Sequence, residues 1–303
     1  MLKKILLSGV NGQVGHALKN QLLQFDVIAL TRDQLDLSNT HNIRQVVREL
    51  KPNLIINPAA YTAVDKAESE PELAFAINGT APQILAEEAA RLNASIIHFS
   101  TDYVYDGTKK TAYIEVDDVN PISVYGKSKL LGENAIRSVG LPHLILRTSW
   151  VYGAYGKNFL KTILRLAAER DNLKIVADQF GAPTSSHSIA EGVVNLLNVW
   201  QDNQESQTGI YHFTNTEYTS WHGFSCEIVT EYNRLSKVRG WPKLKANVED
   251  IIAISTAEYP TPAARPQNSK LDNTKLKSVF KLELPSWQQG LQQVIQSLQI
   301  AEK

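Results

Sequence analysis

The sequence KILLSGVNGQVG (residues 4–15) sets the expected fold, because an apolar run leads directly into a loop with three glycines. Ala17, Leu18, Leu22 and Leu23 follow at helical spacing, so the loop is a turn from a strand into a helix. Glycine lets a backbone approach a ligand closely, and the free N–H groups of a helix N-terminus attract phosphate. The G-x-x-G-x-x-G spacing therefore predicts a dinucleotide-binding turn, and the alternative is a plain tight turn.

Apolar runs alternate with helical patterns in the first half of the chain. The expected strands are residues 4–8, 26–30, 53–58, 95–100 and 143–147, and the expected helices include residues 43–50 and 82–92. This alternation predicts an α/β fold with a doubly wound parallel sheet of Rossmann type. Right-handed crossovers bring the carboxyl ends of the strands to one edge, where ligands of such sheets bind.

The ends of the first three expected strands supply the candidate cofactor contacts. They are Gly9, Gly12, Gln13, Val14 and Gly15 in the first turn, Arg32, Asp36 and Leu37 after the second strand, and Ala59, Ala60 and Thr62 after the third. A basic residue after the second strand favours the 2′-phosphate of NADPH, so Arg32 points to NADPH, with NADH possible. The alternative for Arg32 is a solvated loop arginine.

Two further stretches, STDYVY (residues 100–105) and VYGKSK (residues 124–129), carry the chemistry. The first is expected to be a strand running out of the sheet, and the second to begin a helix. Tyr125 and Lys129 are four residues apart, so they share a helical face. A nearby cation lowers the pKa of a tyrosine from its usual value of about 10, and a hydroxyl from Thr101 can polarise a carbonyl. These residues predict carbonyl reduction, with hydride from a nicotinamide and a proton from Tyr125.

The glycine turn, STDYVY and YGKSK resemble the extended short-chain dehydrogenase/reductase superfamily. Within it, residues 59–68, 147–152, 178–184 and 260–266 closely resemble the dTDP-4-dehydrorhamnose reductase family. That family reduces the 4-keto group of dTDP-6-deoxy-L-lyxo-4-hexulose to give dTDP-L-rhamnose. The resemblance implies a dTDP-sugar substrate and a nucleotide-sugar role in cell-surface polysaccharide biosynthesis.

The resemblance also implies roles for individual residues. Thr101, Tyr125 and Lys129 would be the catalytic set, with Tyr125 and Lys129 also touching the cofactor. Asp102 and Trp150 would line the sugar pocket, although Trp150 could instead be a core aromatic. Further candidate contacts to the nucleotide sugar are Asn158, Gln179 and Arg265.

One departure from the family concerns metal. Some members dimerise through a magnesium ion held partly by a glutamate just after the last glycine of the turn. That position is occupied here by Ala17, with His16 before it, and Glu191 alone is near a plausible partner position. We therefore expect no metal site, no magnesium-bridged dimer, and a monomer or weak homodimer.

Two other functions remain open at this point. The first is a nucleotide-sugar epimerase or 4,6-dehydratase, since Asp102 lies next to the Thr101 hydroxyl. The glutamate that usually follows in dehydratases is absent, because Tyr103 follows instead. The second is a non-enzymatic module similar to the regulatory subunit of methionine adenosyltransferase.

The composition narrows the class of protein. The 303 residues carry 31 basic and 31 acidic side chains, so a nucleic-acid partner is not expected. The single cysteine, Cys226, excludes an intramolecular disulfide. No run of about 18 apolar residues suggests a membrane span, and we expect a soluble cytoplasmic protein.

The chain is expected to form two interleaved parts. Residues 1–150 would form the dinucleotide-binding domain, to which residues 173–215 return. The substrate-binding part would comprise mainly residues 151–172 and 216–303.

Overall fold

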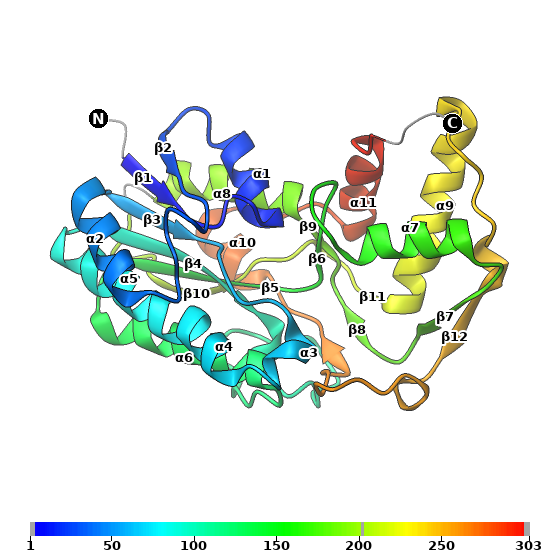
Figure 1. Ribbon diagram of the computed structural model, residues 1–303, viewed down its shortest axis with the longest axis horizontal. Coiled ribbons are helices and arrows are strands. Elements are labelled where there is room, and N and C mark those ends of the chain that lie inside the picture. Colours follow the sequence, from blue (N-terminus) through cyan, green and yellow to red (C-terminus); the bar gives the residue numbers. More distant parts are fainter. Residues whose placement is uncertain (1–3, 201–202, 300–303) are drawn as a thin grey trace.

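A six-stranded parallel sheet forms the centre of the computed structural model, which describes residues 4–200 and 203–299 (Figure 1). Its strands are β1 (Lys4–Leu7), β2 (Asp26–Ala29), β3 (Leu54–Asn57), β4 (Ser95–Thr101), β5 (His143–Thr148) and β10 (Gly209–His212). They lie in the order β10-β5-β4-β3-β1-β2, and every neighbouring pair is parallel. The order reverses direction beside β1, so the predicted doubly wound sheet is confirmed.

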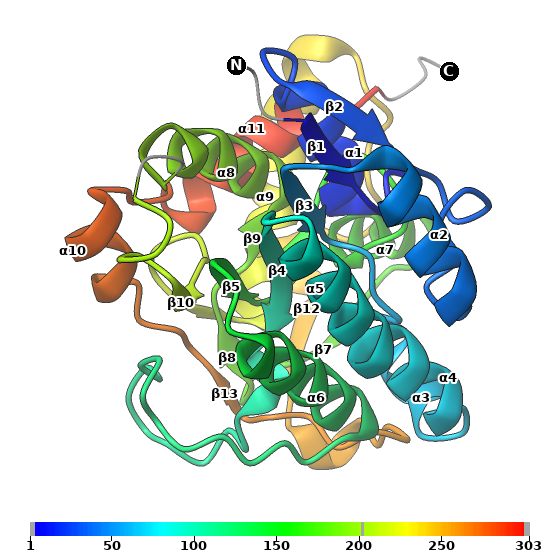
Figure 2. The same ribbon diagram turned by 90° about the vertical axis from the view of Figure 1, so that its left-hand side faces the viewer.

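Helices cover both faces of this sheet. One face carries α1 (Gln13–Gln21), α8 (Ser186–Trp200) and α10 (Thr274–Phe280), and the other carries α2 (Thr40–Leu50), α5 (Ala81–Arg91) and α6 (Val124–Val139). Alternate residues of β1 point to opposite faces, so Ile5 and Leu7 pack in one core and Leu6 in the other. Figure 2 shows α2, α5 and α6 side by side, as their mutual contacts require.

Short elements fill the connections near the carboxyl edge of the sheet. They are α3 (Val64–Ala67), α4 (Pro71–Phe75), the π-helical turn η1 (Ala76–Thr80) and the 3₁₀ turn η2 (Asp102–Val104). The expectation of a strand through Tyr105 was wrong, because β4 ends at Thr101. The Thr101 hydroxyl accepts the Tyr103 N–H at 3.2 Å, and the Tyr105 N–H donates to the Asp102 carbonyl at 3.0 Å, so a helical turn replaces the strand.

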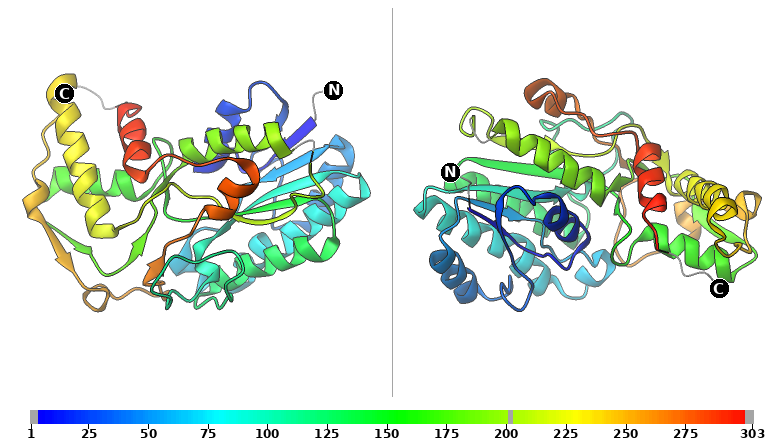
Figure 3. Two further views of the ribbon diagram at one scale, coloured as in Figure 1. Left: turned by 180° about the vertical axis from the view of Figure 1, so that it is seen from behind. Right: turned by 90° about the horizontal axis from the view of Figure 1, so that it is seen from above.

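A second group of elements lies at one end of the sheet (Figures 1 and 3). Its helices are α7 (Phe159–Glu169), α9 (Trp221–Arg239) and α11 (Trp287–Gln296), with the 3₁₀ turns η3 (Val248–Asp250) and η4 (Thr256–Glu258). Its strands are β6 (Val151–Tyr152), β7 (Leu173–Val176), β8 (Phe180–Gly181), β9 (Thr184–Ser185), β11 (Thr219–Ser220), β12 (Ile251–Ile254) and β13 (Asn268–Ser269). These helices share a hydrophobic core separate from those of the sheet.

The chain crosses between the two groups more than once. β7 pairs in parallel with β12 in a separate two-stranded sheet, whereas α8 and β10, later in the sequence, pack on or join the central sheet. Within residues 4–200 and 203–299, no helix has the length and apolar character needed to cross a membrane.

Candidate active site

A cavity of about 590 Å³ opens at the carboxyl ends of the central strands. The predicted cofactor residues all line it: Gly9, Gly12, Gln13, Val14, Gly15, Arg32, Asp36, Leu37, Ala59, Ala60, Thr62, Tyr125 and Lys129. Thr101, Asp102 and Trp150 line the same cavity. The parallel sheet therefore brings together predicted residues that are up to 141 positions apart, from Gly9 to Trp150 (150 minus 9).

The glycines of the turn carry no side chains, so the turn leaves space for a ligand in the cavity wall. Gly9 has φ +59°, and a Cβ there would come within 2.8 Å of the Ala59 Cβ. A Cβ on Gly15 would lie 2.2 Å from the Gly9 carbonyl oxygen. The N-terminus of α1 begins next to Gly12, whose N–H closes the turn by donating to the Gly9 carbonyl at 2.9 Å. This backbone cradle and helix end fit the phosphates of a dinucleotide.

Arg32 and Asp36 lie at the far end of the cavity, after β2. Asp36 accepts hydrogen bonds from the Ser38 hydroxyl at 2.7 Å and the Ser38 N–H at 2.9 Å. These bonds hold the pKa of the Asp36 carboxyl below its usual range, and the charge of Arg32 acts in the same direction. Arg32 itself is exposed, and in the part of the chain that the structure describes it forms no ion pair. A guanidinium at this place suits a 2′-phosphate.

The predicted catalytic side chains come from β4 and the first turns of α6. The Ser123 hydroxyl caps α6 by accepting the Gly126 N–H at 3.1 Å, which fixes the helix start one residue before Tyr125. The Tyr125 ring packs edge to face on Tyr103, with ring centroids 5.4 Å apart. Lys129, one turn later, donates from Nζ to the Phe99 carbonyl at 2.6 Å.

Burial raises the pKa of the Tyr125 phenol to about 12, while the Thr101 hydroxyl lowers it and the Asp102 charge raises it further. The predicted lowering of this pKa by Lys129 together with the nicotinamide stays a prediction, because in the protein alone burial outweighs the groups that favour the phenolate. The physical reason is the loss of water around the phenol, which disfavours its charged form. Burial also lowers the pKa of Lys129 to about 8, and the charge of Glu133 opposes that shift.

Asp102 is the most unusual carboxyl group of the site. It is 3% exposed, and its Oδ1 accepts the Thr101 hydroxyl at 3.1 Å. Its Oδ2 is buried without a hydrogen-bond partner in the described residues. Burial raises the pKa of Asp102 to about 6, while the nearby Ser269 and Thr101 hydroxyls act to lower it. The carboxyl therefore changes charge close to physiological pH.

Trp150 forms one wall of the cavity together with Trp221, the first residue of α9. The two indole rings stack with centroids 3.5 Å apart and planes 10° apart. Trp150 has φ +49°, which is rare for a side chain of this size, and Gly181 leaves space for its ring. Trp221 was not predicted, because no local pattern shows that a helix from the second group reaches the cavity.

Three predicted substrate contacts lie outside the cavity lining. Asn158 caps α7 and donates to Gln13 Oε1 at 3.0 Å, and Gln179 donates to the Thr256 hydroxyl at 3.1 Å. Arg265 forms a two-bond ion pair with Asp65, at 2.9 and 2.7 Å. Lys157, in contrast, lines the cavity and was not predicted. It follows a short turn with no motif, and a lysine in a loop is usually a solvated residue.

The described residues contain no group of three or more His, Cys, Asp or Glu side chains that could hold a metal ion. Glu191 instead pairs with His187 on α8, with Nε2 and Oε1 3.1 Å apart. His16 stacks on Tyr155 with ring centroids 3.8 Å apart.

Comparison with known proteins places the chain in a family. The family model described as RmlD substrate binding domain matches residues 3–300. A dTDP-4-dehydrorhamnose reductase from Burkholderia thailandensis is 46% identical, over 94% of this chain and 95% of its own length. The enzyme of that name from Escherichia coli K12 is 40% identical, over 97% of both chains.

Solved structures agree with the sequence comparison. A crystal structure of dTDP-4-dehydrorhamnose reductase from Bacillus anthracis in complex with NADP matches with a TM-score of 0.88 and 35% identity, covering 97% of this chain and 99% of its own. A dTDP-glucose 4,6-dehydratase from Streptomyces venezuelae matches with a TM-score of 0.75 but 17% identity, which shows a shared fold alone.

Proposed function

The chain belongs to the dTDP-4-dehydrorhamnose reductase family, and from this premise we propose how its residues reduce dTDP-4-dehydro-6-deoxy-L-mannose to dTDP-L-rhamnose. The protein is an NADPH-dependent oxidoreductase of nucleotide-sugar metabolism. The observation that carries the proposal is that Thr101, Tyr125 and Lys129 line the same cavity as the glycine turn. The turn that would bind the cofactor and the tyrosine that would donate the proton therefore line the same cavity.

Bound NADPH would supply the hydride that reaches the 4-keto carbon. Tyr125 donates its phenolic proton to the carbonyl oxygen as negative charge develops there. With its pKa near 12, the phenol is fully protonated at neutral pH, so it is available as an acid in every molecule. An alkoxide is more basic than a phenolate, which makes this proton transfer favourable.

Thr101 and Lys129 support the proton transfer. The Thr101 hydroxyl lies at the end of β4 and donates to Asp102 Oδ1, and with substrate bound it would turn its single proton to the same carbonyl oxygen. Lys129 lies one turn beyond Tyr125, where its positive charge stabilises the phenolate left after proton transfer. We assign it a second role, a hydrogen bond to the nicotinamide ribose.

The sugar is expected to lie between the catalytic set and the paired indoles of Trp150 and Trp221. Stacked aromatic rings give a sugar a flat apolar surface at little entropic cost. Asp102 can accept a hydrogen bond from a sugar hydroxyl through Oδ2, which has no other partner in the described residues. Arg265, Gln179 and Asn158 remain predicted contacts to the dTDP group.

The division of the chain, its assembly and its location also remain proposals. Residues 1–150, with α8 and β10, would supply mainly the cofactor part. Residues 173–185, which hold β7, β8 and β9, belong instead with the substrate part formed mainly by residues 151–172 and 216–303. A monomer or weak homodimer in the cytoplasm, where nucleotide sugars and NADPH meet, fits this role.

A turnover assay tests the proposed function. The purified protein is mixed with the 4-keto sugar nucleotide and NADPH, and the absorbance of the reduced nicotinamide is followed. We expect stoichiometric consumption of NADPH with formation of dTDP-L-rhamnose. Bound NADPH without consumption would instead support the regulatory module, and conversion of the sugar without net oxidation would support an epimerase or dehydratase.

A further inference from the structure

Behind the cavity, a carboxylate on α6 is held by groups from two neighbouring strands. Glu133 is 1% exposed and lies one helical turn beyond Lys129. It accepts hydrogen bonds from Arg147 of β5, at 2.9 Å from Nε and 2.6 Å from Nη2. It also accepts a short hydrogen bond from the Ser100 hydroxyl of β4. Helix and sheet are thus joined at one buried carboxylate.

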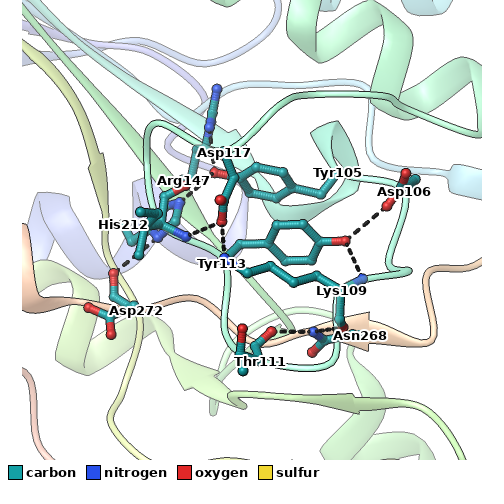
Figure 4. Close-up of polar contacts among 11 residues, drawn as sticks. Tyr105, Asp106, Lys109, Thr111, Tyr113, Asp117, Arg147, His212, Asn268 and Asp272 are labelled. Atoms are coloured by element: carbon teal, nitrogen blue, oxygen red, sulfur yellow. Dashed lines mark hydrogen bonds and ion pairs between the residues drawn. The ribbon is translucent and has the colours of Figure 1, made fainter.

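Arg147 is itself held by Tyr105, which lies beside His212 (Figure 4). Its Nη1 donates to the Tyr105 hydroxyl at 2.7 Å, and that oxygen lies 2.8 Å from His212 Nε2. Burial and the charge of Arg147 lower the pKa of His212 to about 3, so this histidine is neutral. Glu133 and Arg147 are therefore the two charges of this cluster, and neither can turn away without losing a buried bond.

Glu133 is connected to the predicted catalytic set in two ways, through Ser100 and along α6. Ser100 is the residue before Thr101, so its bond to Glu133 fixes the end of β4 against α6. Tyr125, Lys129 and Glu133 follow at intervals of four on one face of α6. The distance between the Thr101 hydroxyl and the Tyr125 phenol depends on this contact between strand and helix.

We propose that Glu133 is a positioning residue, which holds Thr101 in place through Ser100 and keeps Lys129 positively charged. The inference rests on the proposed reductase function and adds a residue that does not itself line the cavity. Arg147 serves in turn to fix the Glu133 carboxylate.

The electrostatic surroundings of Lys129 support this role. Titratable groups on the elements packed against α6 include His98 of β4, Arg147 of β5, Asp102 and Tyr103 of η2, and Tyr125 and Glu133 of α6 itself. On α3 and α5, which also contact α6, Asp65 and Glu88 are paired with arginines. His98 is buried with a pKa far below its usual value, so it is neutral although its Nε2 lies 3.3 Å from Lys129 Nζ. Glu133 is the group whose charge favours the lysine cation.

The pH dependence of kcat/KM for NADPH tests the proposal. In the wild-type protein we expect activity to fall as the pH rises through about 8, where Lys129 loses its proton. In Glu133→Gln the Lys129 cation loses the nearby negative charge that stabilises it. The pKa of Lys129 therefore falls, and the pH at which kcat/KM declines (the pH limb) moves down by about one unit. Glu133→Asp keeps the negative charge, so kcat/KM should again decline at the pH seen in the wild-type protein. An unmoved limb in a folded Glu133→Gln protein would overturn the proposal.

Glu88 provides the matched control. It is 1% exposed, is held by Arg44 and Arg48 at 2.6 and 2.7 Å, and lies on α5 away from the cavity lining. Glu88→Gln removes an equally buried carboxylate, so it should lower stability and leave the pH limb in place. A limb shifted equally by Glu88→Gln would show a general effect of destabilisation and overturn the proposal.

If Glu133→Gln does not fold, Ser100→Ala tests the proposal instead, because this variant keeps the charges of Glu133 and Arg147. We expect kcat to fall about tenfold with the pH limb unmoved, since Thr101 loses its anchor. Unchanged kcat in this variant would overturn the proposal. Wild-type turnover is measured alongside, so an inactive wild-type protein would identify a failure of the proposed function instead.

Discussion

At the scale of single residues, Asp102 lowers the stability of the folded protein and also lines the candidate active site. Its folded pKa of about 6 lies above the ordinary value of 3.8, so the folded protein binds the proton more tightly than the unfolded chain does. Stability therefore decreases as the pH rises from about 4 to about 6, and the full cost is present above that range. Residues with such a cost are common in sites selected for function.

Asp102→Asn should remove this cost. The amide can still accept the Thr101 hydroxyl, and it carries no charge to bury. We expect the free energy of unfolding to rise by about 2–3 kcal/mol at pH 7.5 and to change little at pH 3.5, while turnover falls. Urea unfolding at the two pH values measures the difference. A variant less stable than wild type at pH 7.5 would contradict the assigned state of Asp102.

The sequence pointed to many of the residues around the cavity, and the reasons are physical. Thr101, Tyr125 and Lys129 could be grouped because parallel strands end at one edge and residues four apart share a helical face. The raised pKa of Tyr125 could not be predicted, because it depends on how far the folded protein removes water from the phenol. Their catalytic roles remain predictions that the substitutions described here test.

At the scale of elements, the turn from β1 to α1 depends on a close backbone approach between Gly15 and Gly9. A side chain at Gly15 would collide with the Gly9 carbonyl oxygen, which belongs to the turn itself. The turn and the start of α1 must therefore move apart to accept any larger residue. The colliding oxygen belongs to the backbone, so no rotamer change can relieve the collision.

Gly15→Ala should weaken NADPH binding by about tenfold or more, because the N–H groups of the turn lose their alignment. Fluorescence titration with NADPH measures the dissociation constant. Lys19→Ala, on an exposed position of the same helix, is the control and should leave it unchanged. Equal dissociation constants for Gly15→Ala and wild type would show that the turn does not contact the dinucleotide.

The order of strands and helices up to residue 148 followed from periodicity, because buried parallel strands are short apolar runs separated by helices. Beyond it, strands of two residues such as β6, β8 and β9 carry no periodic signal. The pairing of β7 with β12 joins residues 173–176 to residues 251–254, and no local pattern specifies such a distant partner.

At the scale of the whole molecule, the proline-rich segment of residues 259–266 is tied to α3 across about 200 positions of sequence. Arg265 binds Asp65 with both terminal nitrogens, and the Ala263 N–H donates to the same carboxylate at 3.2 Å. The Asp65 side chain is 42% exposed and that of Arg265 is 24% exposed. Solvent screening therefore limits the contribution of the pair to stability to less than about 1 kcal/mol.

Arg265→Met should raise KM for the sugar nucleotide about tenfold if Arg265 binds the diphosphate. Asp65→Asn is the matched control, because it breaks the same ion pair but leaves the guanidinium free, and its KM should stay within about twofold of wild type. Steady-state kinetics with saturating NADPH compare the two variants. Equal increases in KM would indicate that the arginine acts only by holding the segment to α3.

The proposed reduction depends most on Tyr125 as the proton donor in one cavity shared by cofactor and sugar. The most direct measurement is the turnover number of Tyr125→Phe with the 4-keto sugar nucleotide, together with its dissociation constant for NADPH. We predict a fall in kcat of about a thousandfold with an unchanged dissociation constant, because only the acidic hydroxyl is removed. Turnover close to that of the wild-type protein would contradict the assignment of Tyr125 as the proton donor.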